Sequence, residues 1–329
     1  MLDGRIAIRK SRLFLFWAFS LALLFLSPQG TEAQLVKFRA VYPGVNVPYL
    51  PLSVAQAKGI FKSEGLDAEL VVVRGANQGV LALVSGDAHF AMTIGPVLPA
   101  IWSGVDLKLL AQMVSTQTFS LIVRPEIKRF EDLKGKKIGV SFGGMTLVLA
   151  RELFRLNGME AEKEVDYVNI PGNGPKVIAL EKGLISGALL PPPADVKMVE
   201  AGFRRLVFLG DILPDLPFTG LIATDRYIRE NPKTVEKMVR AIVRAVYLCR
   251  DDPETAIGVM QSHLKMRPQE ARETYPLVRK FFSPLLTESG VRRMAAVVSK
   301  SAGVKPTKEP KDYMDLSFLD RALSELGRR

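Results

Sequence analysis

Short apolar runs alternate with amphipathic helical patterns along most of this chain. The first set of strand-like runs comprises Val36–Tyr42, Ala68–Val73, His89–Thr93 and Lys108–Gln112. Parallel strands need helical crossovers, so strands that alternate with helices of this length indicate βαβ units. The sequence therefore predicts an α/β architecture in which helices cover the faces of each sheet.

The alternation then restarts, which points to a second sheet. The second set of strand-like runs comprises Phe119–Val123, Lys137–Ser141, Val165–Ile170, Gly187–Leu190 and Leu206–Leu209. One further apolar run, Phe218–Thr224, precedes a helical tail that begins at Asn231-Pro232, a typical helix start. We expect two lobes, each a mixed, mainly parallel sheet flanked by helices, with a ligand cleft at the hinge.

If the helical tail returns to the first lobe, the chain crosses between the lobes twice. The crossings would lie near Ser120–Arg124 and Pro217–Leu221. Lobe one is then predicted to contain residues 34–122 and 221–329, and lobe two residues 123–220. Two short strand-like crossings would act as a hinge.

Residues 1–33 have the pattern of a secretory signal peptide. Four basic residues precede the apolar run Leu13–Leu26, and a polar stretch ends in Thr31-Glu32-Ala33. This run has 14 residues, fewer than the ~20 that a membrane-spanning helix needs. Cleavage after Ala33 would export a mature chain that begins at Gln34, to the periplasm or another extracytoplasmic space. An uncleaved membrane anchor is the alternative.

The positive charge of the chain raises the question of nucleic-acid binding. Lys and Arg number 45 against 34 Asp and Glu, a net charge of +11. The excess lies mainly in residues 221–329, which hold 21 basic and 14 acidic residues. A nucleic-acid groove would focus such residues around aromatic platforms, whereas here they are spread over helix faces. We interpret them as solvated surface and expect no nucleic-acid partner.

Few residues of the types used in catalysis or metal binding are present. Cys249 is the single cysteine, and His89 and His263 are the only histidines, which argues against a disulfide framework and a His/Cys metal site. The sequence has no Gly-x-Ser-x-Gly elbow and no phosphate-binding loop. We therefore expect no metal, no cofactor and no catalytic residue, and a protein that is not an enzyme.

One segment resembles a known family. Ala82–Ala91 (ALVSGDAHFA) resembles the AL-x-SG-x-x-D-x-A signature of type II periplasmic substrate-binding proteins. The resemblance is closest to the ABC transporter family (SsuA-like) that serves nitrate, sulfonate, taurine and thiamine-pyrimidine uptake. It covers roughly residues 36–326 and departs at His89, where the family commonly has aspartate. Further matching segments are Ala57–Phe61 with Glu64–Leu66, Asp132–Gly139 and Ala223–Pro232.

The resemblance implies a fold and a function. The expected fold is the two-lobed periplasmic-binding-protein type II fold. The expected function is that of an exported, monomeric receptor that captures a small ligand and delivers it to the transmembrane subunits of an ABC permease. Hinge closure would trap the ligand between the lobes.

Strand order predicts where the ligand binds. In parallel α/β sheets, ligands lie beyond the carboxyl ends of the strands, where loops meet helix N-termini. The loops expected to face the cleft are Tyr42–Leu52, Arg74–Gln78, Thr93–Pro96, Ser141–Thr146 and Ile170–Pro175, with Pro191–Asp195 nearby. The candidate ligand-binding residues in these loops are Tyr42, Asn46, Tyr49, Arg74, Asn77, Thr93, Gly95, Ser141, Gly143, Gly144, Thr146, Asn173 and Pro192.

The segment SFGGMT, Ser141–Thr146, is the most specific of these loops. Gly143 and Gly144 would let the backbone approach a ligand closely, and Thr146 is expected to cap the following helix and leave N–H groups free for an anion. An ordinary capped turn is the alternative interpretation.

Other loop residues suggest the character of the ligand. Arg74 could clamp an anionic group, and Tyr42, Tyr49 and Phe142 could stack on a flat molecule. The alternatives are a solvated arginine and aromatic packing within the lobe. We expect a small ligand that is anionic or heteroaromatic.

Two other functions are compatible with the same fold. The first is an enzyme resembling the thiamine-pyrimidine synthases or the menaquinone-pathway enzymes. The leader-like N-terminus and the missing His/Cys-rich motif of the synthases argue against it. The second is the extracytoplasmic sensor of a signalling system, which would need a separate signalling partner.

Overall fold

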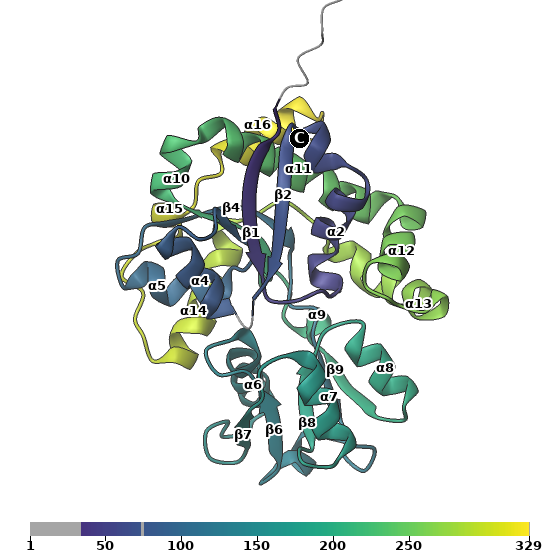
Figure 1. The fold of residues 1–329 in the computed structure, drawn as a ribbon. Coiled ribbons are helices and arrows are strands. Elements are labelled where there is room, and N and C mark those ends of the chain that lie inside the picture. The colour runs from purple at the N-terminus through teal and green to yellow at the C-terminus, as the bar shows by residue number, and fades with distance from the viewer. Residues whose placement is uncertain (1–33, 74–75, 329) are drawn as a thin grey trace, which may run out of the picture. The chain divides into compact units, whose positions relative to one another are not determined.

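Two five-stranded sheets form the core of the computed structural model, which describes residues 34–73 and 76–328 (Figure 1). The first sheet contains, in spatial order, β2 (Leu66–Val72), β1 (Val36–Tyr42), β3 (Phe90–Ala91), β10 (Thr219–Thr224) and β4 (Leu107–Val114). The second contains β7 (Asp166–Asn169), β6 (Lys137–Val140), β8 (Gly187–Leu190), β5 (Ser120–Val123) and β9 (Arg204–Phe208). We call the first sheet with its helices lobe one and the second with its helices lobe two.

The two sheets repeat one topology. In lobe one, β1 pairs in parallel with β2 and β3, and β10 runs antiparallel between β3 and β4. In lobe two, β6 pairs in parallel with β7 and β8, and β5 runs antiparallel between β8 and β9. The reversed strand of each sheet is therefore the one that follows a crossing between lobes. The expected α/β fold of mixed, mainly parallel sheets is confirmed.

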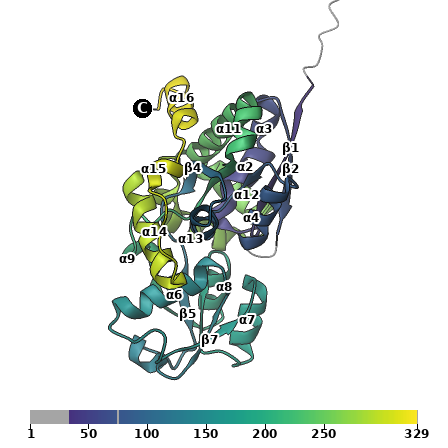
Figure 2. The same ribbon diagram turned by 90° about the vertical axis from the view of Figure 1, so that its left-hand side faces the viewer.

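The helices of lobe one precede the first crossing or follow the second, and they cover both faces of the first sheet (Figures 1 and 2). The helical segments before the first crossing are η1 (Val47–Tyr49), α2 (Leu50–Ala57), α3 (Ile60–Ser63), α4 (Ala76–Ser85), η2 (Gly95–Val97) and α5 (Leu98–Trp102). Those after the second crossing are α10 (Asp225–Glu230), α11 (Pro232–Asp251), α12 (Pro253–Ser262), α13 (Pro268–Val278), η4 (Arg279–Phe281), α14 (Glu288–Ala302), α15 (Pro310–Tyr313) and α16 (Ser317–Glu325).

Lobe two has fewer helices. They are η3 (Phe130–Leu133), α6 (Met145–Leu156), α7 (Asn173–Glu181), α8 (Ala194–Glu200) and α9 (Leu209–Ile212). The sequence predicts the end of α6 well, because Asn157 is its C-cap and Gly158 follows with a positive φ of 73°. That conformation is favourable for glycine and stops the helix.

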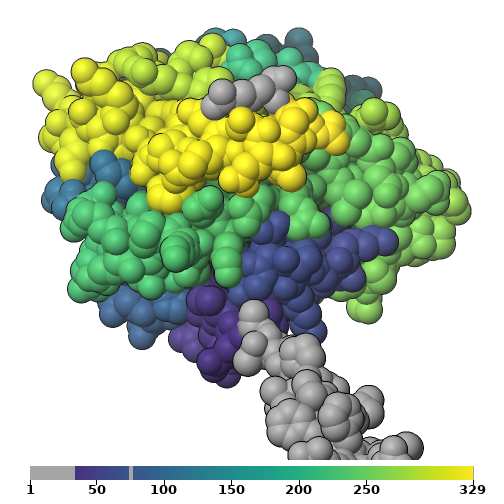
Figure 3. All heavy atoms as spheres, turned by 90° about the horizontal axis from the view of Figure 1, so that it is seen from above, coloured from purple at the N-terminus to yellow at the C-terminus, as the bar shows by residue number. Residues whose placement is uncertain are grey.

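The longest helix, α11, joins the tail to lobe one. Pro232 begins it and the apolar face predicted from its periodicity is buried, because Val235, Met238 and Val246 are each 0% exposed. On its other side Arg240 Nε lies 2.7 Å from a Glu64 carboxylate oxygen, and its Nη1 lies 2.8 Å from Glu325 in α16. Seen from above, the C-terminal segment lies along the green segment that includes α11 (Figure 3).

The two crossings between lobes are tied to each other by one buried side chain. Gln117, 0% exposed, follows β4 and donates from Nε2 to the carbonyl oxygens of Leu216 (3.1 Å) and Pro217 (2.9 Å), which precede β10. Phe119 and Phe218 add a ring contact with centroids 4.8 Å apart. The crossings therefore form a single hydrogen-bonded unit. They lie just before the predicted positions, because Ser120–Val123 is already β5 of lobe two and Thr219–Thr224 is β10 of lobe one.

The expected signal peptide falls on residues 1–33, which lie outside the described residues. Within the part of the chain that the structure describes, no helix is both long and apolar enough to cross a membrane. Cys249 is buried in α11, and burial raises the pKa of its thiol.

Candidate ligand cleft

Loops that follow the carboxyl ends of strands in both sheets meet one another. After β1, the Val47 N–H donates to the carbonyl oxygen of Pro192, in the loop after β8, over 3.1 Å. In the loop after β3, Gly95 lies against the side chain of Met145. Met145 is the first residue of α6, the helix that follows β6 in the chain. This meeting place is where α/β sheets bind ligands, and it contains most of the residues singled out in the sequence.

The loop between β6 and α6 is folded by its own hydrogen bonds. The Ser141 N–H donates to Thr146 Oγ1 over 2.8 Å, and the Gly144 N–H donates to the Ser141 carbonyl oxygen over 3.1 Å. The expectation that Thr146 caps α6 was wrong. Gly144 is the N-cap residue and Thr146 lies within the first turn, where its hydroxyl turns back to hold Ser141. The N-terminus of α6 therefore has no side-chain cap.

Two residues that the sequence analysis did not single out support the same loop. Asn169, the last residue of β7, accepts a hydrogen bond from the Phe142 N–H through Oδ1 over 2.9 Å. Lys176, in the first turn of α7, donates from Nζ to Ser141 Oγ over 3.1 Å. A position in the first turn of a helix that follows a strand of the sheet was the sequence signal that could have identified Lys176.

Lys176 is 1% exposed, an unusual environment for a lysine. Side chains on a helix tilt toward its N-terminus, so the amine of Lys176 points to the carboxyl edge of the sheet. Burial lowers the pKa of this amine to about 8. Among the described residues, its one polar partner is the Ser141 hydroxyl. A buried cation without a carboxylate partner gains most from an anionic group of a ligand.

Asn77 and Gly143 bring the two lobes into direct contact. Gly143 has a φ of +70°, and a Cβ built on it would lie 2.3 Å from Asn77 Nδ2. Gly95 has similarly little room, because a Cβ there would lie 2.3 Å from Met145 Sδ. At both places the absence of a side chain lets the lobes approach.

The aromatic and amide candidates of lobe one lie at the end of β1. The rings of Tyr42 and Tyr49 have centroids 5.5 Å apart, and burial raises the pKa of both hydroxyls, which therefore stay protonated. Asn46 precedes η1, and its buried Oδ1 has no hydrogen-bond partner within the described part of the chain. Pro192, in the facing loop, is buried next to this segment.

The structure does not bring all the candidates together. Thr93 is 5% exposed after β3, and Asn173 is the half-buried first residue of α7, but neither forms a side-chain hydrogen bond to the other candidates. Arg74 lies outside the described residues. Phe142, considered as a stacking surface, is 53% exposed.

Asp195, the acidic residue of the Pro191–Asp195 loop, forms hydrogen bonds that stabilise lobe two. Its Oδ2 accepts hydrogen bonds from Ser120 Oγ (2.6 Å) and Arg205 Nη2 (3.1 Å). Burial raises the pKa of this carboxyl, while the Ser120 and Arg205 contacts oppose that rise. No group of three His, Cys, Asp or Glu side chains among residues 34–73 and 76–328 is arranged to hold a metal ion.

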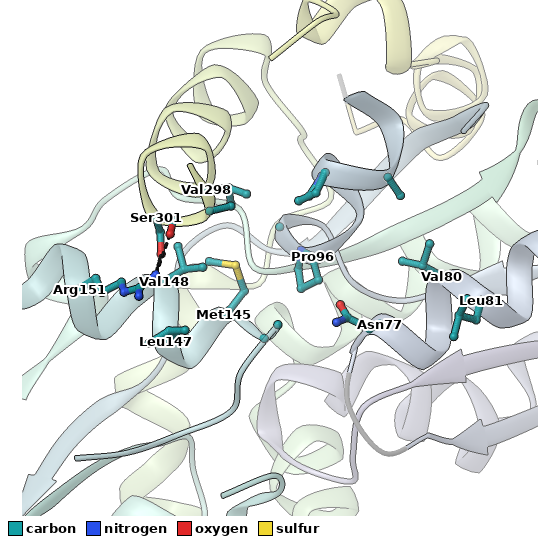
Figure 4. A pocket seen from close by; sticks show the side chains of 16 residues that line it. Asn77, Val80, Leu81, Pro96, Met145, Leu147, Val148, Arg151, Val298 and Ser301 are labelled. Atoms are coloured by element: carbon teal, nitrogen blue, oxygen red, sulfur yellow. Dashed lines mark hydrogen bonds between the residues drawn. The ribbon is translucent and has the colours of Figure 1, made fainter. Parts of the chain in front are cut away.

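A pocket of about 550 Å³ lies between the lobes (Figure 4). Four of the sequence candidates line it: Asn77, Gly95, Gly143 and Gly144. Helices α4, α5, α6 and α14 supply the other walls, so that both lobes contribute. Figure 2 shows α14 reaching α6, the helix of lobe two that forms one wall.

Comparison with known proteins assigns the family. The model of the NMT1/THI5-like family matches residues 46–256. A protein of Brucella abortus (strain 2308), whose name places it among binding proteins, is 28% identical over 319 residues, which cover 92% of this chain and 97% of the relative.

Solved structures show the same fold. The periplasmic nitrate-binding protein NrtA of Synechocystis PCC 6803 has a TM-score of 0.75 at 15% identity, covering 89% of both chains. The sulfonate-binding protein SsuA of Methylobacillus flagellatus KT has a TM-score of 0.72 at 19% identity, covering 90% of this chain and 96% of that one. The desulfurization enzyme DszB has a TM-score of 0.65 at 17% identity, covering 88% and 99%. The chain has the periplasmic-binding-protein fold and belongs to the NMT1/THI5-like family.

Proposed function

We propose that this chain is an extracytoplasmic solute receptor that closes two lobes on a small organic ligand and delivers it to an ABC-type permease. The observation that carries the proposal is that loops from the carboxyl ends of the strands in both sheets contact each other. Asn77 lies against Gly143, and the Val47 N–H donates a hydrogen bond to the Pro192 carbonyl oxygen. A ligand at this place contacts both lobes, so its binding free energy favours the closed arrangement. The names of the Brucella relative and of the NrtA and SsuA structures agree with this function.

The charge distribution of the cleft favours a ligand with an anionic group. Lys176 supplies a buried amine in lobe two that donates a hydrogen bond to Ser141. The N-terminus of α6, which has no side-chain cap, begins in the same loop at Gly144. Helix N-termini attract anions through unpaired N–H groups and the helix dipole. Sulfonate, carboxylate and other oxyanion groups fit this environment.

The direct test is identification of what the exported protein carries. Protein recovered from native cells is examined by native mass spectrometry, and the same sample after denaturation and refolding is the control. We expect a small molecule bound one-to-one that is absent after refolding and binds again in calorimetric titration. A protein that carries no molecule and gains none from a cell extract would contradict the receptor proposal.

Delivery and export need separate measurements. Uptake of the isotope-labelled ligand by cells that lack this chain should fall, and should return when the chain is restored. N-terminal sequencing of the exported protein should begin at Gln34. Conversion of the molecule to a product by the purified protein would instead favour the enzyme alternative, for which DszB shows that the fold can carry catalysis.

A further inference from the structure

The pocket between the lobes is chemically different from the cleft around Lys176. Its walls are apolar: α4 contributes Val80 and Leu81, α6 contributes Leu147 and Val148, and α14 contributes Val298. In Figure 4 the labelled side chains of α6 and α14 lie on one side and those of α4 on the other, with Pro96 and Met145 between them. Among the described residues that line the pocket, Arg151 carries the only charge.

Arg151 joins two walls of the pocket. Its Nη1 donates to the carbonyl oxygen of Ser301 over 2.7 Å, at the C-terminal end of α14. Carbonyl groups in the last turn of a helix have no partner within the helix, and a basic side chain satisfies them and complements the helix dipole. The guanidinium therefore holds α6 of lobe two against α14 of lobe one at the edge of the pocket.

The size and lining of the pocket decide between ligand classes. Its volume of about 550 Å³ lies within the range of roughly 300–1,000 Å³ typical of sites for small organic molecules. An inorganic anion or a zwitterion would lose hydration against the apolar part of the wall and would find polar groups only at its edge, at Asn77, Arg151 and Ser301 and in the glycine loops. A hydrocarbon or aromatic group gains free energy by leaving water for the same walls.

The position of the pocket argues for a molecule held during closure. Gly95, Gly143 and Gly144 line the pocket and also belong to the loops predicted to face the cleft, so the pocket adjoins these loops. Because both lobes supply walls, an occupant contacts both and stabilises the arrangement in which they meet.

We infer that this pocket binds the hydrocarbon or aromatic body of a small organic molecule that the protein holds between its lobes. The inference rests on the proposed function and specifies the chemical class of its ligand. A molecule of this class has an apolar body that fills the pocket, and any polar group that it carries is directed through the glycine loops toward the cleft.

The pocket can be tested with a neutral apolar probe, N-phenyl-1-naphthylamine, whose fluorescence rises when it leaves water. Leu81 lines the pocket and is 68% exposed, so that Leu81→Asp places a charge on the wall without disturbing the core. Leu184, 63% exposed in lobe two and outside the pocket, provides the matched control Leu184→Asp. Thermal melts of both variants check folding.

We expect saturable one-to-one binding of the probe to the wild-type protein, weakened at least tenfold by Leu81→Asp and unchanged by Leu184→Asp. A second variant, Ala100→Trp, fills the pocket from α5 and should have the same effect as Leu81→Asp. Absence of saturable binding, or equal loss in Leu81→Asp and Leu184→Asp, would overturn the inference.

The probe titration and the search for a carried solute test different claims, so either one can give a negative result while the other is positive. If the exported protein carries no solute but the pocket binds the probe, the receptor proposal fails and the pocket remains an apolar binding site. If a solute is carried but Leu81→Asp binds both it and the probe as tightly as the wild type, the receptor proposal stands and the assignment of this pocket is wrong.

Discussion

At the scale of single residues, Lys176 is the side chain whose surroundings differ most from those its chemistry favours. Its amine lies beside the Ser141 hydroxyl with 1% of the residue exposed. Burial lowers its pKa from 10.5 to about 8, so the folded protein loses this proton more easily than the unfolded chain. Folding therefore carries a cost at neutral pH that an anionic ligand could offset.

The first prediction concerns the pH dependence of that cost. Below pH 8 the amine is protonated in both states and the full cost applies, and between pH 8 and 10.5 the unfolded chain binds more protons, so stability rises with pH. Replacing the buried cation by an apolar side chain of similar length, Lys176→Met, should raise the free energy of unfolding at pH 7 by up to about 3 kcal/mol. The gain should disappear near pH 10.5.

Urea denaturation at pH 7 and at pH 10 measures this difference. Lys182→Met, at the exposed C-cap of the same helix, is the control and should change stability little at either pH. A Lys176→Met protein that is less stable than wild type at pH 7 would mean that the site favours the charged amine.

Gly143 gives a second prediction, because the stability cost of its positive φ and the cost of its contact with Asn77 can be measured separately. Gly143→Ala should be destabilised by roughly 1–2 kcal/mol from its left-handed backbone, and by a smaller amount because its Cβ would displace the exposed Asn77 amide, whose Nδ2 lies 2.3 Å from the built Cβ. In the double variant with Asn77→Ala only the backbone cost should remain. A double-mutant cycle of denaturation free energies isolates the contact between lobes.

Gly172→Ala is the control for this cycle. Gly172 also has a positive φ, of 88°, but the nearest atom to a built Cβ is Pro175 Cδ at an ordinary 3.5 Å. It should show the backbone cost with no dependence on Asn77. A coupling of zero between Gly143 and Asn77 would mean that the Asn77 side chain does not contact Gly143 in solution.

At the scale of elements, the crossings between lobes give the third prediction. Gln117→Leu removes two hydrogen bonds and leaves the Leu216 and Pro217 carbonyl groups without this buried partner. Such a loss costs about 1–3 kcal/mol. Hydrogen exchange should quicken in both crossings together, because one side chain joins them.

The exposed Gln269→Leu is the comparison for this variant, since the Gln269 side chain donates to Glu273 Oε1 one turn away on the surface of α13. Equal stability of the two variants would show that the crossings are not coupled through Gln117.

The elements were also the part of the structure that the sequence predicted best. Strands such as Val36–Tyr42 and Gly187–Leu190 were identified with the bounds that the structure has, because apolar runs between turn residues identify buried strands. The end of α6 is similarly marked in the sequence by Asn157-Gly158, a typical helix stop. These features depend on local periodicity and on the conformational preference of glycine, which a sequence displays directly.

The loops were harder to predict, because their hydrogen bonds join residues far apart in sequence. Thr146 was expected to cap α6, but its hydroxyl accepts from Ser141, five residues earlier. Lys176 lies 35 positions from Ser141, and nothing local marks it as buried. The apolar pocket is lined by helices from both lobes. Its composition depends on the contact between α6 and α14, which lie far apart in the sequence, so local patterns do not predict it.

At the scale of the whole described chain, the contacts between the lobes include three polar ones. Arg151 of α6 donates to Ser301 of α14, the Arg267 guanidinium pairs with the Glu200 carboxylate of α8, and Val47 donates to Pro192. The first two contacts involve charged groups that are partly exposed, and each is worth little alone. Opening and closing should therefore be finely balanced, as a receptor that must both capture and release its ligand requires.

The last prediction follows from that balance. Replacing both arginines, Arg151→Ala with Arg267→Ala, should shift the ligand-free protein toward an open arrangement, seen as a larger radius of gyration in small-angle X-ray scattering. Apparent affinity for the carried solute should fall because a smaller fraction of the protein is competent to close and because Arg151 itself lines the pocket, while saturating solute should restore the compact radius. Arg155→Ala is the control on α6, since Arg155 pairs with Glu152 of the same helix. If the double variant keeps the wild-type radius and affinity, these contacts do not set the position of the lobes.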